Sequence, residues 1–165
     1  MIVERLKKLS QYNIWAWDHV IDSMRKISDE EFRKERPFFW ESLHGLLAHS
    51  LAAEIIWIER LNHNNPTTLL NEDNFQTLDE IVKEWQVVRN RWNDYLDQLN
   101  DETVLTSLSF ADTQGFERSV VIADIITHVF NHATDHRSQM TPFLHQLGFA
   151  TPSLDYVYFC EGREL

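Results

Sequence analysis

Three histidines recur at four-residue intervals toward the C-terminal end of the chain. His128, His132 and His136 lie within the largely apolar run SVVIADIITHVFNHATDHRSQMTPFLHQLG, residues 119–148. Four residues of α-helix turn the chain by about 40° and advance it by about 6 Å, so the three imidazoles follow one helix face. Imidazole is the commonest protein ligand for transition metals, and a pair at i and i+4 can direct two nitrogens at one ion. The pattern indicates a metal site, against the alternative of ordinary surface or interface histidines.

The spacing alone leaves the ligand pair open. His128 and His136 are separated by roughly 12 Å along a helix axis, which is too far for one ion. A single ion would take either His128 with His132 or His132 with His136, and a third ligand must come from elsewhere. His49 lies in a buried-looking segment, where a neutral histidine bonded to a carbonyl is the usual interpretation unless a partner site exists. His44 and His63, near the ends of that segment, are expected to be solvated.

Four segments with helical periodicity must position these side chains. They cover residues 3–27, 41–62, 77–100 and 119–148, and Pro and Gly are few, four of each, which favours long helices with short connections. The third begins at a capping box formed by Thr77 with Glu80.

The last segment has its own boundary signals. Ser119 is the expected N-cap, Gly148 ends the helix, and Pro142 is expected to kink it after the histidines. Residues 103–118 alternate apolar and polar positions, and Gly115 supplies a turn between them, which predicts a short hairpin.

Two shorter pieces complete the outline. One helical turn is expected at 29–32, and a short closing helix at 154–159. We therefore predict an all-α fold, a four-helix bundle with a short β-hairpin before the last long helix, formed by residues 1–165 as a single domain.

Composition excludes several function classes. The net charge is −11, and the basic residues are scattered among more numerous acids, which argues against nucleic acid or an anionic membrane surface as a partner. No segment approaches the ~18 uninterrupted apolar residues of a membrane span. The only cysteine, Cys160, cannot form an internal disulfide and is expected to be a small, partly buried residue. A cytoplasmic location is expected.

Four segments, spread over nearly the whole chain, resemble the motifs of one protein family. YNIWAW at 12–17 resembles an opening Y-x-x-W-A-N, and SLHGLLAHSLAAEIIWIERL at 42–61 resembles an apolar run around one histidine followed by W-x-x-R-L. ITHVFNHATDHRSQM at 126–140 is similar to H-V-x-N-H-x-x-x-H-R-G-Q, and LGF at 147–149 with PSLDYVYF at 152–159 is similar to the family's ending. All four occur in the order found in the DinB family, which includes the YfiT-type thiol transferases.

The resemblance implies a metal ion between two helices, held by His49, His132 and His136, with His128 beside the site rather than on the ion. Trp17, where the family usually has Asn, Ser138, where Gly is frequent, and the unusual Pro142 depart from the pattern, but none of them removes a ligand.

Three histidines would leave coordination positions open for water or substrate. Ligand type favours zinc or nickel over iron or manganese. The resemblance implies a metal-dependent enzyme acting on a small molecule, either hydrolase-like or a transferase that uses a low-molecular-weight thiol. The alternatives are a metal-binding or stress-associated protein without turnover, and a helical dimerisation module with vestigial histidines. No residue is assigned as catalytic; the candidate proton acceptors are Asp135, Gln139, His128, Asp18 and Glu54. Leftover exposed apolar residues, many of them Trp, are expected to support a homodimer.

Overall fold

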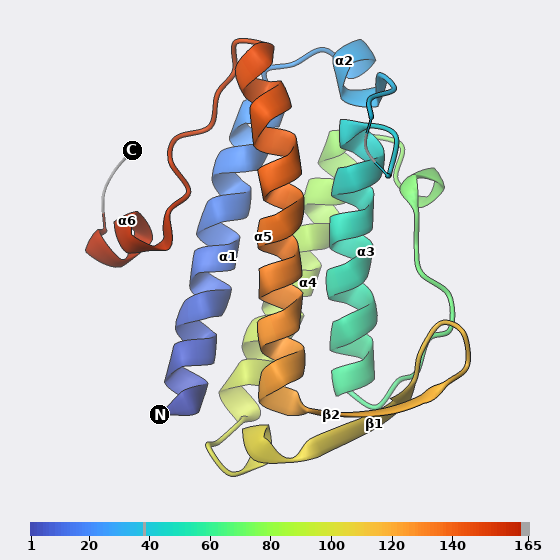
Figure 1. Ribbon diagram of the computed structural model, residues 1–165, viewed down its shortest axis with the longest axis vertical. Coiled ribbons are helices and arrows are strands. Elements are labelled where there is room, and N and C mark those ends of the chain that lie inside the picture. Colours follow the sequence, from blue (N-terminus) through green and yellow to red (C-terminus); the bar gives the residue numbers. More distant parts are fainter. Residues whose placement is uncertain (38, 163–165) are drawn as a thin grey trace.

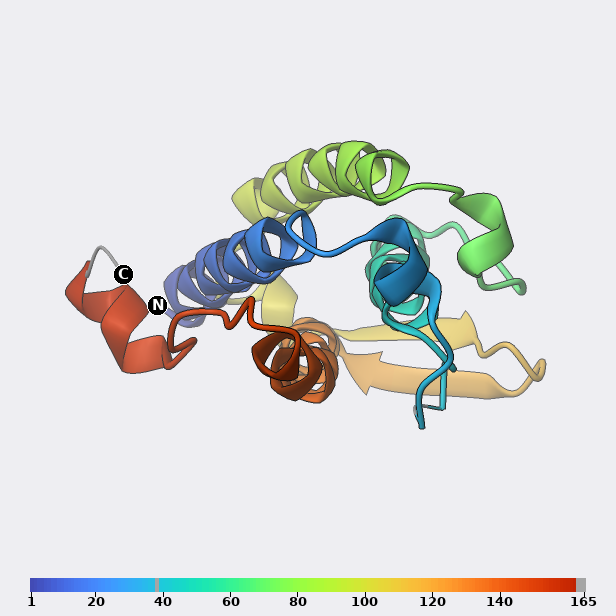
Figure 2. The same cartoon turned by 90° about the horizontal axis from the view of Figure 1, so that it is seen from above.

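Four long helices run side by side along the long axis of the molecule (Figure 1). The computed structural model describes residues 1–37 and 39–162. The long helices are α1 (Ile2–Met24), α3 (Leu43–Leu61), α4 (Leu78–Gln98) and α5 (Ile122–Gln146). α5 packs on α1 and α3, and α4 packs on the other sides of the same two helices, so α4 and α5 are diagonal partners (Figure 2). The four-helix arrangement predicted from the sequence is confirmed.

Shorter elements connect the bundle. They are α2 (Asp29–Arg33), the 3₁₀ turns η1 (Glu72–Asn74) and η2 (Thr103–Leu105), the strands β1 (Ser107–Ala111) and β2 (Glu117–Val121), and α6 (Tyr156–Glu161). The two strands form an antiparallel hairpin that lies across the foot of α5 and α3 (Figure 1). Gly115 adopts φ +86° in the connecting turn, as expected. A hairpin before the last long helix is therefore confirmed.

The predicted start of the last helix at Ser119 is wrong. Ser119 lies in β2 and pairs with Ser109, and α5 begins only at Ile122 with Val121 as its N-cap. The backbone of this residue is committed to the ladder, so its hydroxyl has no helix end to cap. At the other end, α5 continues through Pro142 to Gln146, and Gly148 follows it at φ +86°.

Side-chain caps mark the first turns of α3 and α4. The Ser42 hydroxyl accepts the backbone N–H of Gly45 at 2.9 Å, and the Thr77 hydroxyl accepts that of Glu80 at 3.1 Å. The Glu80 carboxylate returns to the N–H of Gln76 rather than to that of Thr77. The cap at Thr77 is thus confirmed, with its reciprocal bond shifted by one residue.

The tryptophans belong to the interior rather than to the surface. Trp17, Trp85 and Trp92 are fully buried, and the other three are half-buried. Trp17, at the position where the family motif has Asn, packs on Trp85 with 4.5 Å between ring centroids. The expectation of exposed Trp is wrong, and on α4 the seven-residue spacing turns the rings of Trp85 and Trp92 inward. The large apolar side chains that are exposed in the described residues are Met1, Ile2, Phe39, Val87, Leu105, Phe116, Phe149, Tyr156 and Val157.

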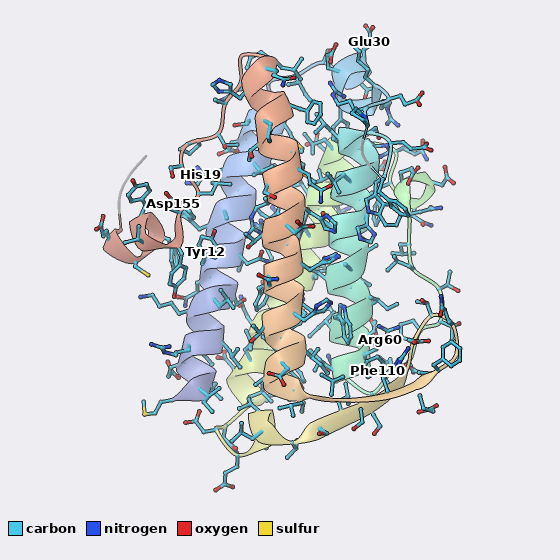
Figure 3. The ribbon with its side chains drawn as sticks, viewed as in Figure 1. Tyr12, His19, Glu30, Arg60, Phe110 and Asp155 are labelled. Atoms are coloured by element: carbon cyan, nitrogen blue, oxygen red, sulfur yellow. The ribbon has the colours of Figure 1, made fainter. Side chains whose placement is uncertain are left out.

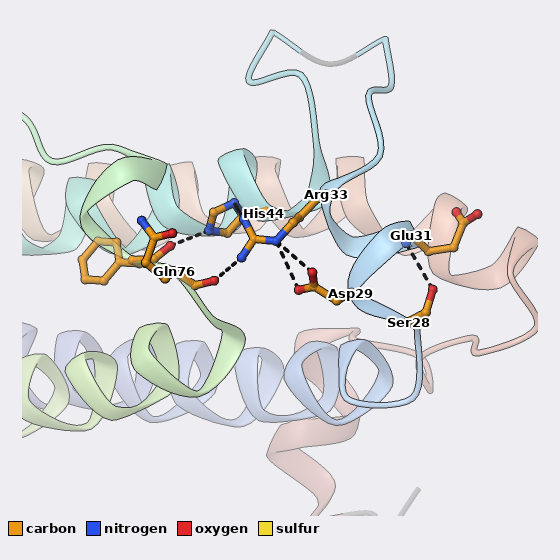
Figure 4. A network of polar contacts seen from close by, with 7 residues as sticks. Ser28, Asp29, Glu31, Arg33, His44 and Gln76 are labelled. Atoms are coloured by element: carbon orange, nitrogen blue, oxygen red, sulfur yellow. Dashed lines mark hydrogen bonds and ion pairs between the residues drawn. The ribbon is translucent and has the colours of Figure 1, made fainter.

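His44 is buried instead of solvated, which corrects the sequence-based expectation. Its Nε2 lies 2.7 Å from the carbonyl oxygen of Phe75, and its Nδ1 lies 3.3 Å from Arg33 Nη1 (Figure 4). Arg33 also bonds Asp29 and the carbonyl of Gln76, so one guanidinium joins α2, α3 and the segment before α4. Burial lowers the pKa of His44. His63 is exposed, as expected.

The C-terminal helix α6 stands outside the bundle next to α1 (Figure 2). It contacts α1 through rings, with Tyr156 and Phe159 centroids at 5.1 and 5.8 Å from that of Tyr12. Cys160 is exposed rather than partly buried, in a helix that stands outside the bundle. Within the described residues, none of the helices combines the length and apolar character needed to cross a bilayer.

Candidate metal centre

Three histidines from two neighbouring helices converge between α3 and α5. His49 comes from α3, and His132 and His136 come from successive turns of α5. One ligand-capable atom from each lies within 4.8 Å of the others, and the Nε2 atoms of His132 and His136 are 3.0 Å apart. The ring of His49 lies 5.4 Å from that of His132 and 4.9 Å from that of His136, measured between centroids. These three residues, the histidine cluster, are those that the family motif singled out.

The segment that precedes α3 covers one face of the His49 ring. Trp40 stacks on it with 3.8 Å between centroids and 15° between planes. Glu41, the residue after it, adopts φ +63°, which turns the chain sharply into the Ser42 cap. A Cβ at Gly45 would collide with the carbonyl oxygen of Trp40, so a glycine is needed for this close approach. Sequence reasoning missed Trp40; the signal was an aromatic run directly before a helix cap.

Burial keeps the cluster uncharged near neutral pH. Desolvation, followed by the neighbouring imidazoles of His136 and His132, lowers the pKa of His49 to about 3. Burial and His132 lower the pKa of His136 to about 4, against an opposing influence of Asp135, and burial also lowers the pKa of His132. Neutral imidazoles carry the lone pair that a metal ion requires. The cluster is therefore ready to accept a cation without first releasing protons.

The donor set fits a divalent transition metal. In the described part of the chain the cluster contains nitrogen donors alone, with no cysteine and no carboxylate. The Nδ1 atoms of His49 and His136 are buried, and neither finds a hydrogen-bond partner among the described residues. Buried polar atoms without a partner are uncommon, and bound water, or at His49 a metal ion, would give them one. Three imidazoles suit zinc, nickel or iron, and a three-ligand site leaves positions open.

The chain is similar to known proteins over nearly its whole length. The sequence model of the DinB family matches residues 1–164. The chain belongs to the DinB family. The "Protein DinB" of Bacillus subtilis (strain 168) is 24% identical over 154 residues, which cover 90% of both chains. A crystal structure of a DinB-like protein from Bacillus subtilis matches this DinB chain with a TM-score of 0.63 at 16% identity, over 89% of this chain and 96% of that one. That likeness shows the shared fold.

His128 sits one helical turn below the cluster of this DinB protein, outside it. Its ring is exposed and lies 5.8 Å from that of His132, between centroids. The ring of Trp57 meets it edge-on at 5.4 Å. His128 is thus beside the cluster and in contact with an aromatic wall, in the place expected from the motif.

Two of the candidate proton acceptors point away from the cluster. Asp18 of α1 pairs with Arg89 of α4 at 2.7 Å. Glu54 is buried and accepts hydrogen bonds from Asn13 Nδ2 at 2.9 Å and from Trp85 Nε1 at 3.1 Å, and burial raises its pKa. Both acids therefore make their ion pair and hydrogen bonds with residues of α1 and α4, away from the cluster.

The other acidic candidate flanks the cluster. Asp135 is exposed, precedes His136 in the chain, and raises the pKa of both α5 histidines electrostatically. The amide of Gln139 donates to its carboxylate at 3.0 Å. Asp135 and Gln139, together with His128, are thus polar groups on α5 that could meet a molecule approaching the cluster from solvent.

Proposed function

We propose that this DinB protein binds one divalent metal ion through His49, His132 and His136 and uses it as an enzyme on a small molecule, as a hydrolase or as a transferase of a low-molecular-weight thiol. The observation that carries the proposal is the convergence of three uncharged imidazoles within 4.8 Å of one another. Three neutral ligands would leave the ion its positive charge and at least one open position, the arrangement typical of catalytic sites.

Residues around the cluster would exclude water from it and exchange protons with the substrate. Trp40 covers His49, so one side of the site is closed to water by an aromatic ring. His128, exposed at the lower edge, and Asp135 beside His136 are positioned to exchange protons with a molecule at the cluster. A bound divalent ion would supply Lewis-acid chemistry, lowering the pKa of a water or a thiol that it holds.

Ligand type favours zinc or nickel, with iron and manganese as weaker choices.

The second candidate function is that of a metal-binding or stress-associated helical dimer without turnover. It is favoured by the polar partners already present: Asp135 is hydrogen-bonded to Gln139, and Glu54 is committed to Asn13 and Trp85. In that case the ion would stabilise the bundle and no proton acceptor would be needed.

Elemental analysis of protein purified without a metal-binding affinity tag tests the first step. We expect close to one divalent ion per chain in the wild type, loss of the ion in His132→Ala, and retention in His128→Ala, which is matched in residue type and lies one turn away. Wild-type protein that binds no zinc or nickel after dialysis against either metal would refute the site. With metal present, turnover of ester or thiol substrates that is lost in His132→Ala supports the enzyme, whereas metal without turnover across that panel supports the second candidate.

A further inference from the structure

A second candidate binding site lies on the side of α5 that faces away from the histidine cluster. A cavity of about 380 Å³ opens between α1, α5 and the irregular segment 147–155 that leads to α6. Thr141, on its wall, follows His132 by nine residues, which is two and a half turns and places the two on opposite sides of the helix. Figure 3 shows Tyr12 and Asp155 on this side of α1, close to the tail. The cavity is therefore separate from the histidine cluster.

The cavity reaches a buried guanidinium. Arg137 lines it while keeping only 2% of its surface exposed. Nη1 donates to Asn13 Oδ1 at 2.6 Å, and Nη2 donates to the Thr134 hydroxyl at 2.9 Å. The rings of Tyr12 and Trp17 lie near its carbon Cζ, at 5.6 and 5.1 Å from their centroids. These contacts fix the orientation of the group.

The amide of Asn13 and the hydroxyl of Thr134, which accept hydrogen bonds from this guanidinium, are uncharged. The nearest acid in the network, Glu54, is joined to it by hydrogen bonds through Asn13, whose Nδ2 donates to Glu54 Oε1 at 2.9 Å, and its electrostatic influence raises the pKa of Arg137 against the stronger lowering by burial. Burial raises the pKa of Glu54, which disfavours its charged form. Among the described residues, Arg137 makes no ion pair. A buried cation without a direct counter-charge is costly, and an anion at the cavity floor would relieve that cost.

The lining of the cavity also includes an acid and several hydroxyls. The carboxylate of Asp155 accepts a hydrogen bond from the Ser153 hydroxyl at 3.0 Å and remains exposed. Ser138 and Thr141 contribute hydroxyls from α5. The Tyr12 hydroxyl donates to the carbonyl of Leu154 at 2.8 Å, which ties the irregular segment over the cavity. A ligand would thus meet a buried cation, side-chain hydroxyls and an exposed carboxylate in one cavity.

We propose that this cavity binds a small organic carboxylate that also carries hydroxyl or ammonium groups, with its carboxylate against Arg137 and its donors toward Asp155 and the hydroxyl-lined wall. The volume falls within the range of small-molecule sites, about 300 to 1,000 Å³. Charge-assisted hydrogen bonds from a fixed guanidinium favour a carboxylate over a neutral hydroxyl compound. Asp155 disfavours ligands that carry negative charge at both ends.

Titration calorimetry and amide chemical shifts of the full-length protein test this assignment with four probes. D-gluconate offers a carboxylate with hydroxyls, L-glutamine a carboxylate with an ammonium, acetate a carboxylate alone, and D-glucose hydroxyls alone. We expect gluconate or glutamine to bind with a Kd of about 1 mM or below, acetate at least tenfold more weakly, and glucose not measurably. Binding that shifts the amides of 134–141 and 151–156 is expected with and without metal.

Three variants make the test specific. Thr141→Leu, at a partly buried wall position, fills the cavity and is expected to weaken binding at least tenfold, while His128→Ala on the opposite face leaves it unchanged. Asp155→Asn is expected to weaken glutamine more than gluconate. Arg137→Lys keeps the charge but loses the fixed fork, and is expected to weaken both carboxylates; unfolding of this variant would be seen by circular dichroism and leaves Thr141→Leu as the decisive comparison. Equal binding of glucose and gluconate, no shifts with either carboxylate, or full affinity in folded Thr141→Leu would overturn the proposal.

Discussion

Lowering the pH from 7.5 to 5.0 should barely change the affinity of the histidine cluster for zinc. A solvated histidine with a pKa of about 6.5 is roughly 97% protonated at pH 5.0, and each such ligand would weaken metal binding about 30-fold. Three solvated ligands would therefore lose more than 10⁴-fold in affinity over this range. Here burial lowers the pKa of His49 to about 3 and that of His136 to about 4, so both remain almost fully neutral at pH 5.0.

The pKa of His132 is also lowered by burial, which limits its share of the loss. We expect the zinc Kd to rise by less than tenfold between pH 7.5 and 5.0. The assay is competition with a chromophoric chelator whose own protonation is corrected at each pH, using tag-free protein. A control peptide with two solvated histidines at i and i+4 should show the steep loss. A change of 10³-fold or more in the protein would refute the packed, desolvated cluster described above.

Three further outcomes follow from the same contacts. The metal-free protein should lose stability as the pH falls below about 6.5 toward 4, because the unfolded histidines take up protons that the folded cluster rejects; urea unfolding at pH 7.5 and 5.0 measures this, and identical midpoints would contradict it. Gly45→Ala should displace Trp40 and cost about 1–3 kcal/mol, seen as a lower unfolding midpoint and a changed tryptophan spectrum, with Ala48→Gly as a helix-propensity control. Asn13→Ala should cost about 3 kcal/mol in urea unfolding, since it removes one buried hydrogen bond from Glu54 and one from Arg137 and leaves them with Trp85 and Thr134 respectively; a loss below about 1 kcal/mol would show that the bridge is not needed.

Local signals in the chain were sufficient for most of the architecture. The apolar periodicity located the four long helices, the Thr77 cap marked the start of α4, and Gly115 marked the hairpin turn. The boundary at Ser119 was wrong because two local signals competed: a serine before an apolar run favours a helix cap, whereas strand pairing with 107–111 extends the hairpin. Pairing across the hairpin decided the outcome, and it depends on residues that a local window does not include.

The buried state of polar residues was harder to predict. His44 lies near a helix start, where solvation is the usual expectation, but the carbonyl of Phe75 covers it from 31 positions away. The same holds for the chain of contacts from Glu54 through Asn13 to Arg137, which joins three helices. Residue spacing within one helix does not predict such a bridge, because the packing of the helices sets its geometry.

The sequence by itself determined that two imidazoles, His132 and His136, share a helix face, because four residues nearly complete one turn of any α-helix. Whether His49 joins them was decided by the tertiary structure, since the distance between α3 and α5 depends on the side chains packed between them. The same packing placed Arg137, the residue after His136, on the side of α5 that faces α1, where it lines the cavity. Adjacent residues on one helix thus serve two different surfaces, because one step of 100° turns the side chain from the α3 side of the bundle to the α1 side.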